Sequence, residues 1–129
     1  MKKRAKEWLK QAVYDMETAD ILFHGGRYFY AVFFCHLSIE KALKGLYQKR
    51  LLRMAPKTHN FTYLLRKSEI DPPEDYRRFL IMLNGASIVT RYPENVERLI
   101  NNYSHPVVRD ILKKSKEVLA WIESQYSES

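Results

Sequence analysis

Residues 28–52 have the sequence YFYAVFFCHLSIEKALKGLYQKRLL, and their spacing predicts one long helix. Over its first three turns this helix is apolar on most of its circumference, through Tyr28, Phe29, Tyr30, Val32, Phe33, Phe34, Leu37 and Ile39. A helix that is apolar on nearly all sides is buried on nearly all sides. We therefore expect it to be the central helix of a bundle, or to turn half of its surface toward a second subunit.

One face of the same helix carries only small side chains, at steps of three and four residues: Ala31, Cys35, Ser38, Ala42 and Gly45. Small side chains at this spacing let another helix approach closely. A glycine inside a helix costs about 1 kcal/mol relative to alanine, and close packing can offset that cost. The stripe is interpreted as a helix–helix contact, either within the chain or across a dimer.

Apolar spacings of three and four residues also predict helices on both sides of this stretch. The first covers residues 3–24 and ends at Gly25-Gly26. A short helix with Phe61, Leu64 and Leu65 follows Pro56, and Thr58-His59-Asn60 supplies its capping side chains. Together these segments account for the first half of the chain.

The second half begins with Asp71-Pro72-Pro73-Glu74, which predicts a helix start with Asp71 as N-cap and prolines in the first turn. This helix ends at Arg91-Tyr92-Pro93, because proline disfavours helix at the residue before it. A short helical turn is expected over residues 96–103, and the last helix begins at Ser104-His105-Pro106. Its expected inward side chains are Val108, Ile111, Leu112, Ser115, Val118, Leu119 and Ile122. Since no segment alternates with period two, we expect an all-α fold, a four- to five-helix up-and-down antiparallel bundle.

The composition fits one domain over residues 1–129, with 46% apolar and 13% aromatic residues. Charged residues are scattered through the chain, so no stretch reaches the roughly 18 apolar residues of a membrane span, and no signal peptide is recognised. The single cysteine, Cys35, excludes an internal disulfide framework and a cysteine-based zinc site. We expect a cytoplasmic protein without membrane association.

The formal net charge of +7 lies entirely in the N-terminal part of the chain. Residues 1–57 hold twelve basic and five acidic side chains, whereas residues 58–129 hold ten of each. From Lys41 to Lys67 there are eight basic side chains and no acidic one. A local positive field of this kind suits a polyanion, which is a nucleotide, an RNA or an acidic partner protein. The alternative is that the cations only complement helix C-termini.

The long helix also carries a polar ridge, because His36, Glu40 and Lys44 follow one another at intervals of four, with Lys41 beside them. Glutamate four residues before lysine is the favourable order for a helical ion pair. One interpretation is a satisfied ion pair on the one solvated stripe of the helix. The other is that Lys41 or Lys44 meets a phosphate while Glu40 holds the lysine in place.

Two other places offer groups suited to a phosphate. His59 lies in a loop and is either a capping or packing residue or a hydrogen-bond donor to a ligand. Arg91 and Tyr92 lie at a helix end that Pro93 makes rigid. Arginine suits bidentate phosphate recognition, and the alternative is that Arg91 satisfies the last carbonyl groups of its helix. Neither a metal site nor a cofactor is expected, because the four histidines lack metal-ligand spacing and no glycine-rich loop occurs.

Taken together, these motifs resemble the HEPN family, whose name stands for higher eukaryotes and prokaryotes nucleotide-binding. The resemblance spans nearly the whole chain and depends on the order of its motifs. They are Trp8, Ala12, Asp15, Ala19, Leu22, Gly26, Tyr28, Ala31 and Phe33, then Glu40-Lys41-Ala42-Leu43-Lys44, Thr58-His59, Leu64-Leu65, Arg91-Tyr92-Pro93 and Trp121. The resemblance implies a helical bundle that commonly forms a homodimer. It also implies partnership with a small nucleotidyltransferase, often as a toxin–antitoxin pair.

Many members of the family are metal-independent ribonucleases, in which an arginine and a histidine with four to six residues between them act across a dimer interface. Two pairs in this chain fit that spacing, namely Arg98 with His105 and Arg53 with His59. Pro56 crosses the second pair, so Arg98 and His105 are the candidate catalytic residues if the protein cuts RNA. In that role His105 would act as general acid–base and Arg98 would stabilise the charged phosphorane.

Three hypotheses follow from these motifs. The favoured one is a dimeric HEPN binding module for a nucleotide or nucleic-acid phosphate, working beside a nucleotidyltransferase. Its site residues are Glu40, Lys41, Lys44, His59, Arg91 and Tyr92. The second is the ribonuclease, and the third is an interaction protein whose anion is the acidic surface of its partner.

Overall fold

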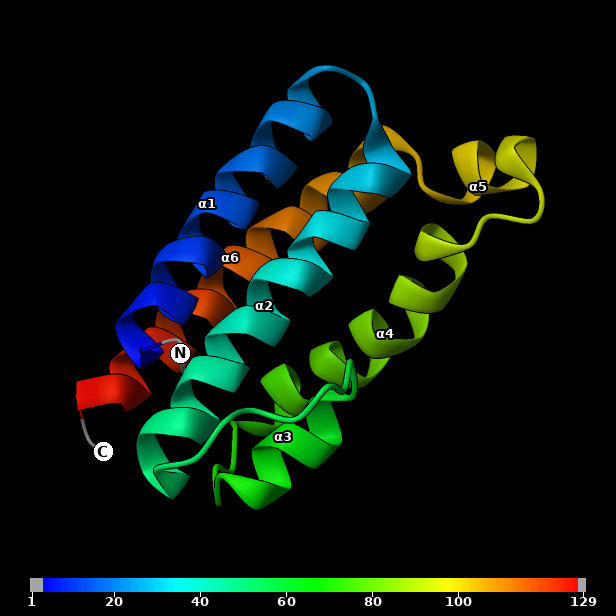
Figure 1. The fold of residues 1–129 in the computed structure, drawn as a ribbon. Coiled ribbons are helices and arrows are strands. Elements are labelled where there is room, and N and C mark those ends of the chain that lie inside the picture. The colour runs from blue at the N-terminus through cyan, green and yellow to red at the C-terminus, as the bar shows by residue number, and fades with distance from the viewer. Residues whose placement is uncertain (1–3, 128–129) are drawn as a thin grey trace.

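A computed structural model describes residues 4–127, which form six helices and no strand. The helices are α1 (Ala5–His24), α2 (Tyr28–Leu51), α3 (Phe61–Lys67), α4 (Glu74–Arg91), α5 (Val96–Asn102) and α6 (His105–Ser127). The predicted all-α class is confirmed. Four long helices alternate in direction, and the short helices α3 and α5 lie before and after α4 (Figure 1). The predicted start of the first helix at residue 3 lies outside the described residues.

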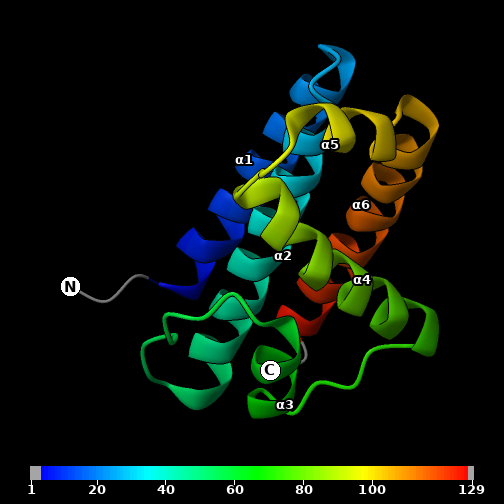
Figure 2. The same cartoon turned by 90° about the vertical axis from the view of Figure 1, so that its right-hand side faces the viewer.

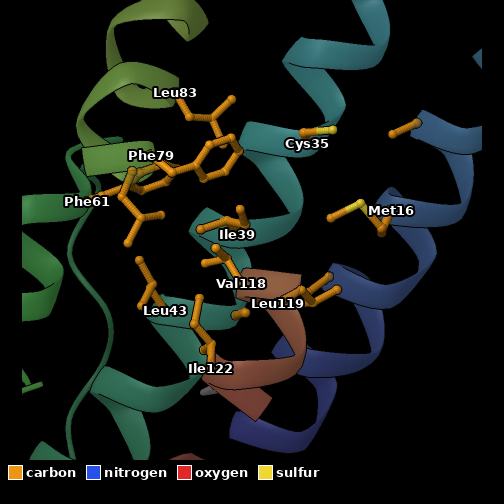
Figure 3. Packing of buried hydrophobic residues seen from close by; sticks show 14 of the residues in the cluster. Met16, Cys35, Ile39, Leu43, Phe61, Phe79, Leu83, Val118, Leu119 and Ile122 are labelled. Carbon is orange, nitrogen blue, oxygen red and sulfur yellow. The ribbon is translucent and has the colours of Figure 1, made fainter. Parts of the chain in front are cut away.

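The helix α2 is central, as its apolar circumference predicts, since it contacts each of the other five helices. Helices α1 and α6 run beside it on one side, and α4 lies on the other with α3 (Figures 1 and 2). Side chains from α1, α2, α3, α4 and α6 meet in one apolar cluster (Figure 3). All seven side chains of α6 that were expected to face inward are buried.

The stripe of small residues on α2 packs inside the chain. The Ser38 hydroxyl donates to the Ala12 carbonyl of α1 at 2.6 Å, and the Tyr126 hydroxyl of α6 donates to the Ala42 carbonyl at 2.6 Å. A Cβ atom on Gly45 would clash with the Tyr126 hydroxyl and lie 2.8 Å from the Trp8 Cβ. Glycine is therefore needed here, because only its missing side chain leaves room for α1 and α6.

The turn between α1 and α2 follows the prediction. Gly25 caps α1, its amide donating to the Ile21 carbonyl at 3.0 Å, and Gly26 adopts a left-handed φ of 78°. Glycine adopts that conformation without steric strain. The two glycines thus reverse the chain and set α1 antiparallel to α2.

The predicted N-terminal capping residue is confirmed for α3 and wrong for α4. The Asn60 side chain accepts a hydrogen bond from the Tyr63 amide at 3.0 Å, which caps α3. Asp71 does not cap α4, since Pro73 occupies the N-cap position and the Asp71 carboxylate pairs with Arg77 instead. Both prolines precede the helix, so the chain enters α4 later than its sequence predicts. None of the helices within residues 4–127 has the length and apolar character needed to cross a membrane.

Candidate functional site

A buried carboxylate on α2 is the centre of the site. Glu40 is only 5% exposed, and its two oxygens meet three potential cations. Its Oε2 lies 3.1 Å from Lys44 Nζ, while its Oε1 lies 2.7 Å from His59 Nδ1 and 3.7 Å from His36 Nδ1. A carboxylate taken out of water needs such partners to stay ionised. We call His36, Glu40, Lys44, His59 and Arg91 the Glu40 cluster.

The polar ridge predicted on α2 is present. It is not exposed to solvent, as the interpretation of a solvated ion pair expects. His36, Glu40 and Lys44 are all buried, because the segment before α3 and α3 itself cover this face of α2. The ion pair between Glu40 and Lys44 forms as their spacing predicts. Lys44 also lies 5.9 Å from the centre of the Trp8 ring of α1. The ion pair between Glu40 and Lys44 is therefore desolvated and lies in the interior of the bundle, not on its surface.

His36 is fully buried and neutral at ordinary pH. Its ring stacks on Phe61 with 4.3 Å between ring centres. The pKa of His36 is lowered to about 4, chiefly by burial; the negative charge of Glu40 opposes this shift and the positive charge of Arg91 adds to it. Neither ring nitrogen makes a hydrogen bond of normal geometry within residues 4–127. His36 thus lies beside the carboxylate without adding charge.

His59 is the exposed member of the cluster, with 59% of its side chain open to solvent. Its Nδ1 is held by Glu40 at 2.7 Å, so it is Asn60, and not His59, that caps α3. When Nδ1 carries the proton to the carboxylate, Nε2 on the other side of the ring is an acceptor. A carboxylate that orients a histidine in this way suits it for binding a ligand group or exchanging a proton.

Arg91 is the unbalanced charge of the cluster. Its guanidinium lies 4.8 Å from the centre of the Phe33 ring, one turn of α2 before His36. Its Nη2 is buried and has no hydrogen-bond partner, and Arg91 pairs with no carboxylate within residues 4–127. The alternative that Arg91 satisfies the last carbonyl groups of α4 is therefore not observed. A guanidinium without a partner, held against an aromatic ring, is available for an anion.

Two of the predicted ligand residues lie elsewhere. Lys41 points toward α1, where its Nζ pairs with Asp15 Oδ2 at 2.7 Å. Tyr92 is 71% exposed and lines a groove of about 500 Å³ between the end of α4 and α5. The structure thus gathers His36, Lys44 and His59 around Glu40, with Arg91 near enough to His36 to act on its charge. Lys41 and Tyr92 lie outside the cluster.

The two candidate ribonuclease residues have separate surroundings. Arg98 is exposed on α5 and lines the same groove as Tyr92. His105 begins α6, and its ring packs against Phe23 and Tyr28, with 4.8 and 5.7 Å between ring centres. Both residues are described by the structure, and no hydrogen bond or ring contact joins them. Within residues 4–127, no group of three or more histidine, cysteine, aspartate or glutamate side chains is arranged so that it could hold a metal ion.

Sequence reasoning missed two contributions to the site. The buried, neutral state of His36 depends on Phe61, and the pairing of His59 with Glu40 joins a loop to a helix nineteen positions earlier. The spacing of residues carries no signal for either contact. The only hint is that His36 and Glu40 lie on an otherwise apolar helix.

Comparison with known proteins agrees with this architecture. The family model described as HEPN domain matches residues 5–125. The crystal structure of ST0689, an archaeal HEPN homologue, is 28% identical, with a TM-score of 0.78 and coverage of 96% of this chain and 98% of that one. The crystal structure of TT1696 from Thermus thermophilus is 27% identical, with a TM-score of 0.79 and coverage of 94% and 97%. No curated protein matches at a significant level. Since the family model covers almost all of its length, the chain belongs to the HEPN domain family.

Proposed function

We propose that this HEPN domain is a binding module whose Glu40 cluster holds the phosphate of a nucleotide or nucleic acid. The observation that carries the proposal is Arg91, a partly buried guanidinium that no carboxylate neutralises within residues 4–127. Glu40 already balances Lys44, and His36 is neutral, so Arg91 leaves the cluster with a net positive charge. Arginine provides the planar donor pair that a phosphate accepts.

The dimensions of the cluster support a ligand of nucleotide size. Arg91 contacts Phe33, and His59 contacts Glu40, seven residues farther along α2. At 1.5 Å per residue these two contacts lie about 10 Å apart along the helix axis. In this proposal Arg91 binds the phosphate, the exposed His59 ring donates or accepts a hydrogen bond, and Glu40 fixes its orientation.

The proposal also includes a partner. HEPN domains commonly form homodimers and act beside a small nucleotidyltransferase, often as a toxin–antitoxin-like pair. Several large apolar side chains between the last turns of α4 and α5 are exposed, and a protein partner would remove them from water. They are Ile88, Val89, Tyr92, Val96 and Ile100.

Isothermal titration calorimetry with AMP and with inorganic phosphate tests the site. The wild type is expected to bind AMP, and Arg91→Gln is expected to weaken binding about tenfold, because a charge-assisted hydrogen bond is lost. Arg78→Gln is the matched control, since it removes the same charge from an exposed part of α4. Equal AMP affinity in the wild type and Arg91→Gln contradicts the proposal, as does the absence of binding at millimolar AMP. Cleavage of RNA that depends on His105 would favour the ribonuclease instead.

A further inference from the structure

The eight basic side chains between Lys41 and Lys67 divide into two groups. Lys41 and Lys44 pair with carboxylates, and Lys49 donates to the Tyr126 carbonyl at 2.5 Å. Arg50 donates to the Ser68 carbonyl at 3.3 Å. The charges of these four are engaged in holding the bundle together.

The other four basic side chains are exposed and form no ion pair within residues 4–127. They are Arg53, Lys57, Arg66 and Lys67. They lie in the segment that follows α2 and on α3, which occupy the same end of the molecule in both views (Figures 1 and 2). A set of like charges without counterions repels itself, and an anionic partner would relieve that repulsion. Their presence at one end therefore points to a ligand rather than to the fold.

An aromatic ring lies among these cations. Tyr63 on α3 is half-buried, and the Arg66 guanidinium and the Lys67 ammonium lie 5.9 and 5.8 Å from its ring centre. Rings with cations beside them are the surfaces on which single-stranded nucleic acids stack their bases. A duplex offers no unstacked base, and an acidic peptide gains nothing comparable from the ring. The ring therefore favours a single strand over either alternative.

These residues are continuous with the Glu40 cluster through His59. Lys57 precedes His59 by two residues and Tyr63 follows it by four. At 3.8 Å between consecutive Cα atoms, Lys57 lies within about 8 Å of His59 and Tyr63 within about 15 Å. A strand with one phosphate at the Glu40 cluster therefore reaches Tyr63 within a few nucleotides.

We infer that Arg53, Lys57, Tyr63, Arg66 and Lys67, here called the basic end, dock a single strand of nucleic acid that leads into the Glu40 cluster. The inference rests on the proposed function and names its ligand class as a polynucleotide rather than a free mononucleotide. The four cations contact backbone phosphates, and Tyr63 stacks on one base. Backbone contacts of this kind are independent of sequence and sensitive to salt.

Fluorescence anisotropy with a labelled oligothymidylate of about twelve nucleotides tests the inference, because DNA lacks the 2′-hydroxyl through which RNA could be cleaved. Four phosphate contacts at the basic end and one at Arg91 give a slope of about −3.5 for log K against log salt concentration, at about −0.7 per contact. The double variant Arg66→Gln/Lys67→Gln is expected to reduce this slope to about −2.1. The control Arg109→Gln/Lys113→Gln removes the same charge from exposed positions on α6 and leaves the slope unchanged.

Variants of Tyr63 provide a second test, because they change oligothymidylate affinity without changing the charge of the protein. Tyr63→Leu is expected to weaken oligothymidylate binding about tenfold at an unchanged salt slope, whereas Tyr63→Phe retains the affinity. Circular dichroism verifies that each variant is as helical as the wild type. The inference is overturned if Arg66→Gln/Lys67→Gln behaves like its control, or if a polyglutamate peptide competes as well as the oligonucleotide.

The same measurements separate this inference from the proposed function. If the basic end binds the strand as inferred, Arg66→Gln/Lys67→Gln lowers oligothymidylate affinity and leaves AMP affinity at the wild-type value. If the wild type binds the oligothymidylate but does not bind AMP, the Glu40 cluster is not a phosphate site. If the wild type binds AMP but does not bind the oligonucleotide, the inference that the basic end docks a single strand is overturned, and the proposed phosphate site still stands.

Discussion

The two faces of α2 differ in how their buried polar groups are satisfied. On the face toward α1 and α6, small residues let the backbones approach, and the polar groups that are buried there bond to carbonyl groups, as Ser38 and Tyr126 do. On the face toward α3 and α4, ionisable side chains of α2 are buried in a row, and Arg91 at the end of α4 lies near them without a counterion within residues 4–127. The first face explains why the chain folds. The second face lies beside a charge that no ion pair within residues 4–127 balances, and this charge is the basis of the proposed binding site.

The largest effect is expected from breaking the ionic face. Glu40→Gln leaves Lys44 buried beside a neutral amide, and removing one partner of a buried ion pair costs about 3 kcal/mol of the free energy of unfolding. Urea denaturation measures it. Glu7→Gln breaks the exposed pair with Lys10 and is expected to cost less than about 0.5 kcal/mol.

A double variant sharpens this prediction. Glu40→Gln/Lys44→Met removes both charges and is expected to recover most of the lost stability, because no uncompensated charge remains. If the double variant is less stable than Glu40→Gln, the desolvated ion pair is not the reason for the loss.

The next effect concerns the small-residue face. Gly45→Ala places a Cβ against Trp8 and Tyr126, and overpacking of this kind costs about 2 kcal/mol despite the better helix propensity of alanine. Gly85→Ala on α4 is the control, since nothing lies within 4 Å of the added Cβ. It is expected to stabilise the protein by up to about 1 kcal/mol. Equal changes in the free energy of unfolding in the two variants would show that α1 and α6 do not pack on Gly45.

A comparable effect is expected on acidification. The native pKa of His36 is about 4, below its ordinary value of 6.5, so between these values the unfolded chain binds a proton that the native state does not. Stability is therefore full above pH 6.5 and falls as the pH drops toward 4. Its loss between about pH 7 and pH 5 is about 2 kcal/mol from this group. The NMR signal of the His36 ring gives the direct reading, and a midpoint near 6.5 contradicts burial of the neutral ring.

The regular part of this fold could be predicted because it depends on local periodicity. The six helical segments and the inward residues of α6 follow from apolar spacing, and the turn at Gly25 and Gly26 follows from backbone freedom. The start of α4 could not be placed, since Asp71 has a choice between capping the helix and pairing with Arg77. That choice depends on side-chain geometry and not on residue type.

The candidate site was predictable only where its residues share one helix. Glu40 and Lys44 lie one turn apart and pair, whereas Lys41 is rotated about 100° around the helix from Glu40 and meets Asp15 of α1. Neighbours in sequence are thus not neighbours in the site. The contact of His59 with Glu40 depends on how the loop before α3 folds over α2, which no short spacing encodes.

The most direct test of a binding role for the ionic face is to measure stability and AMP affinity together in Arg91→Gln. Because Arg91 loses only its contact with the Phe33 ring, and no hydrogen bond or ion pair within residues 4–127, we predict a free energy of unfolding within about 1 kcal/mol of the wild type and an AMP affinity about tenfold weaker. A loss of several kcal/mol in stability with unchanged AMP affinity would contradict it, because Arg91 would then serve the fold and not a ligand.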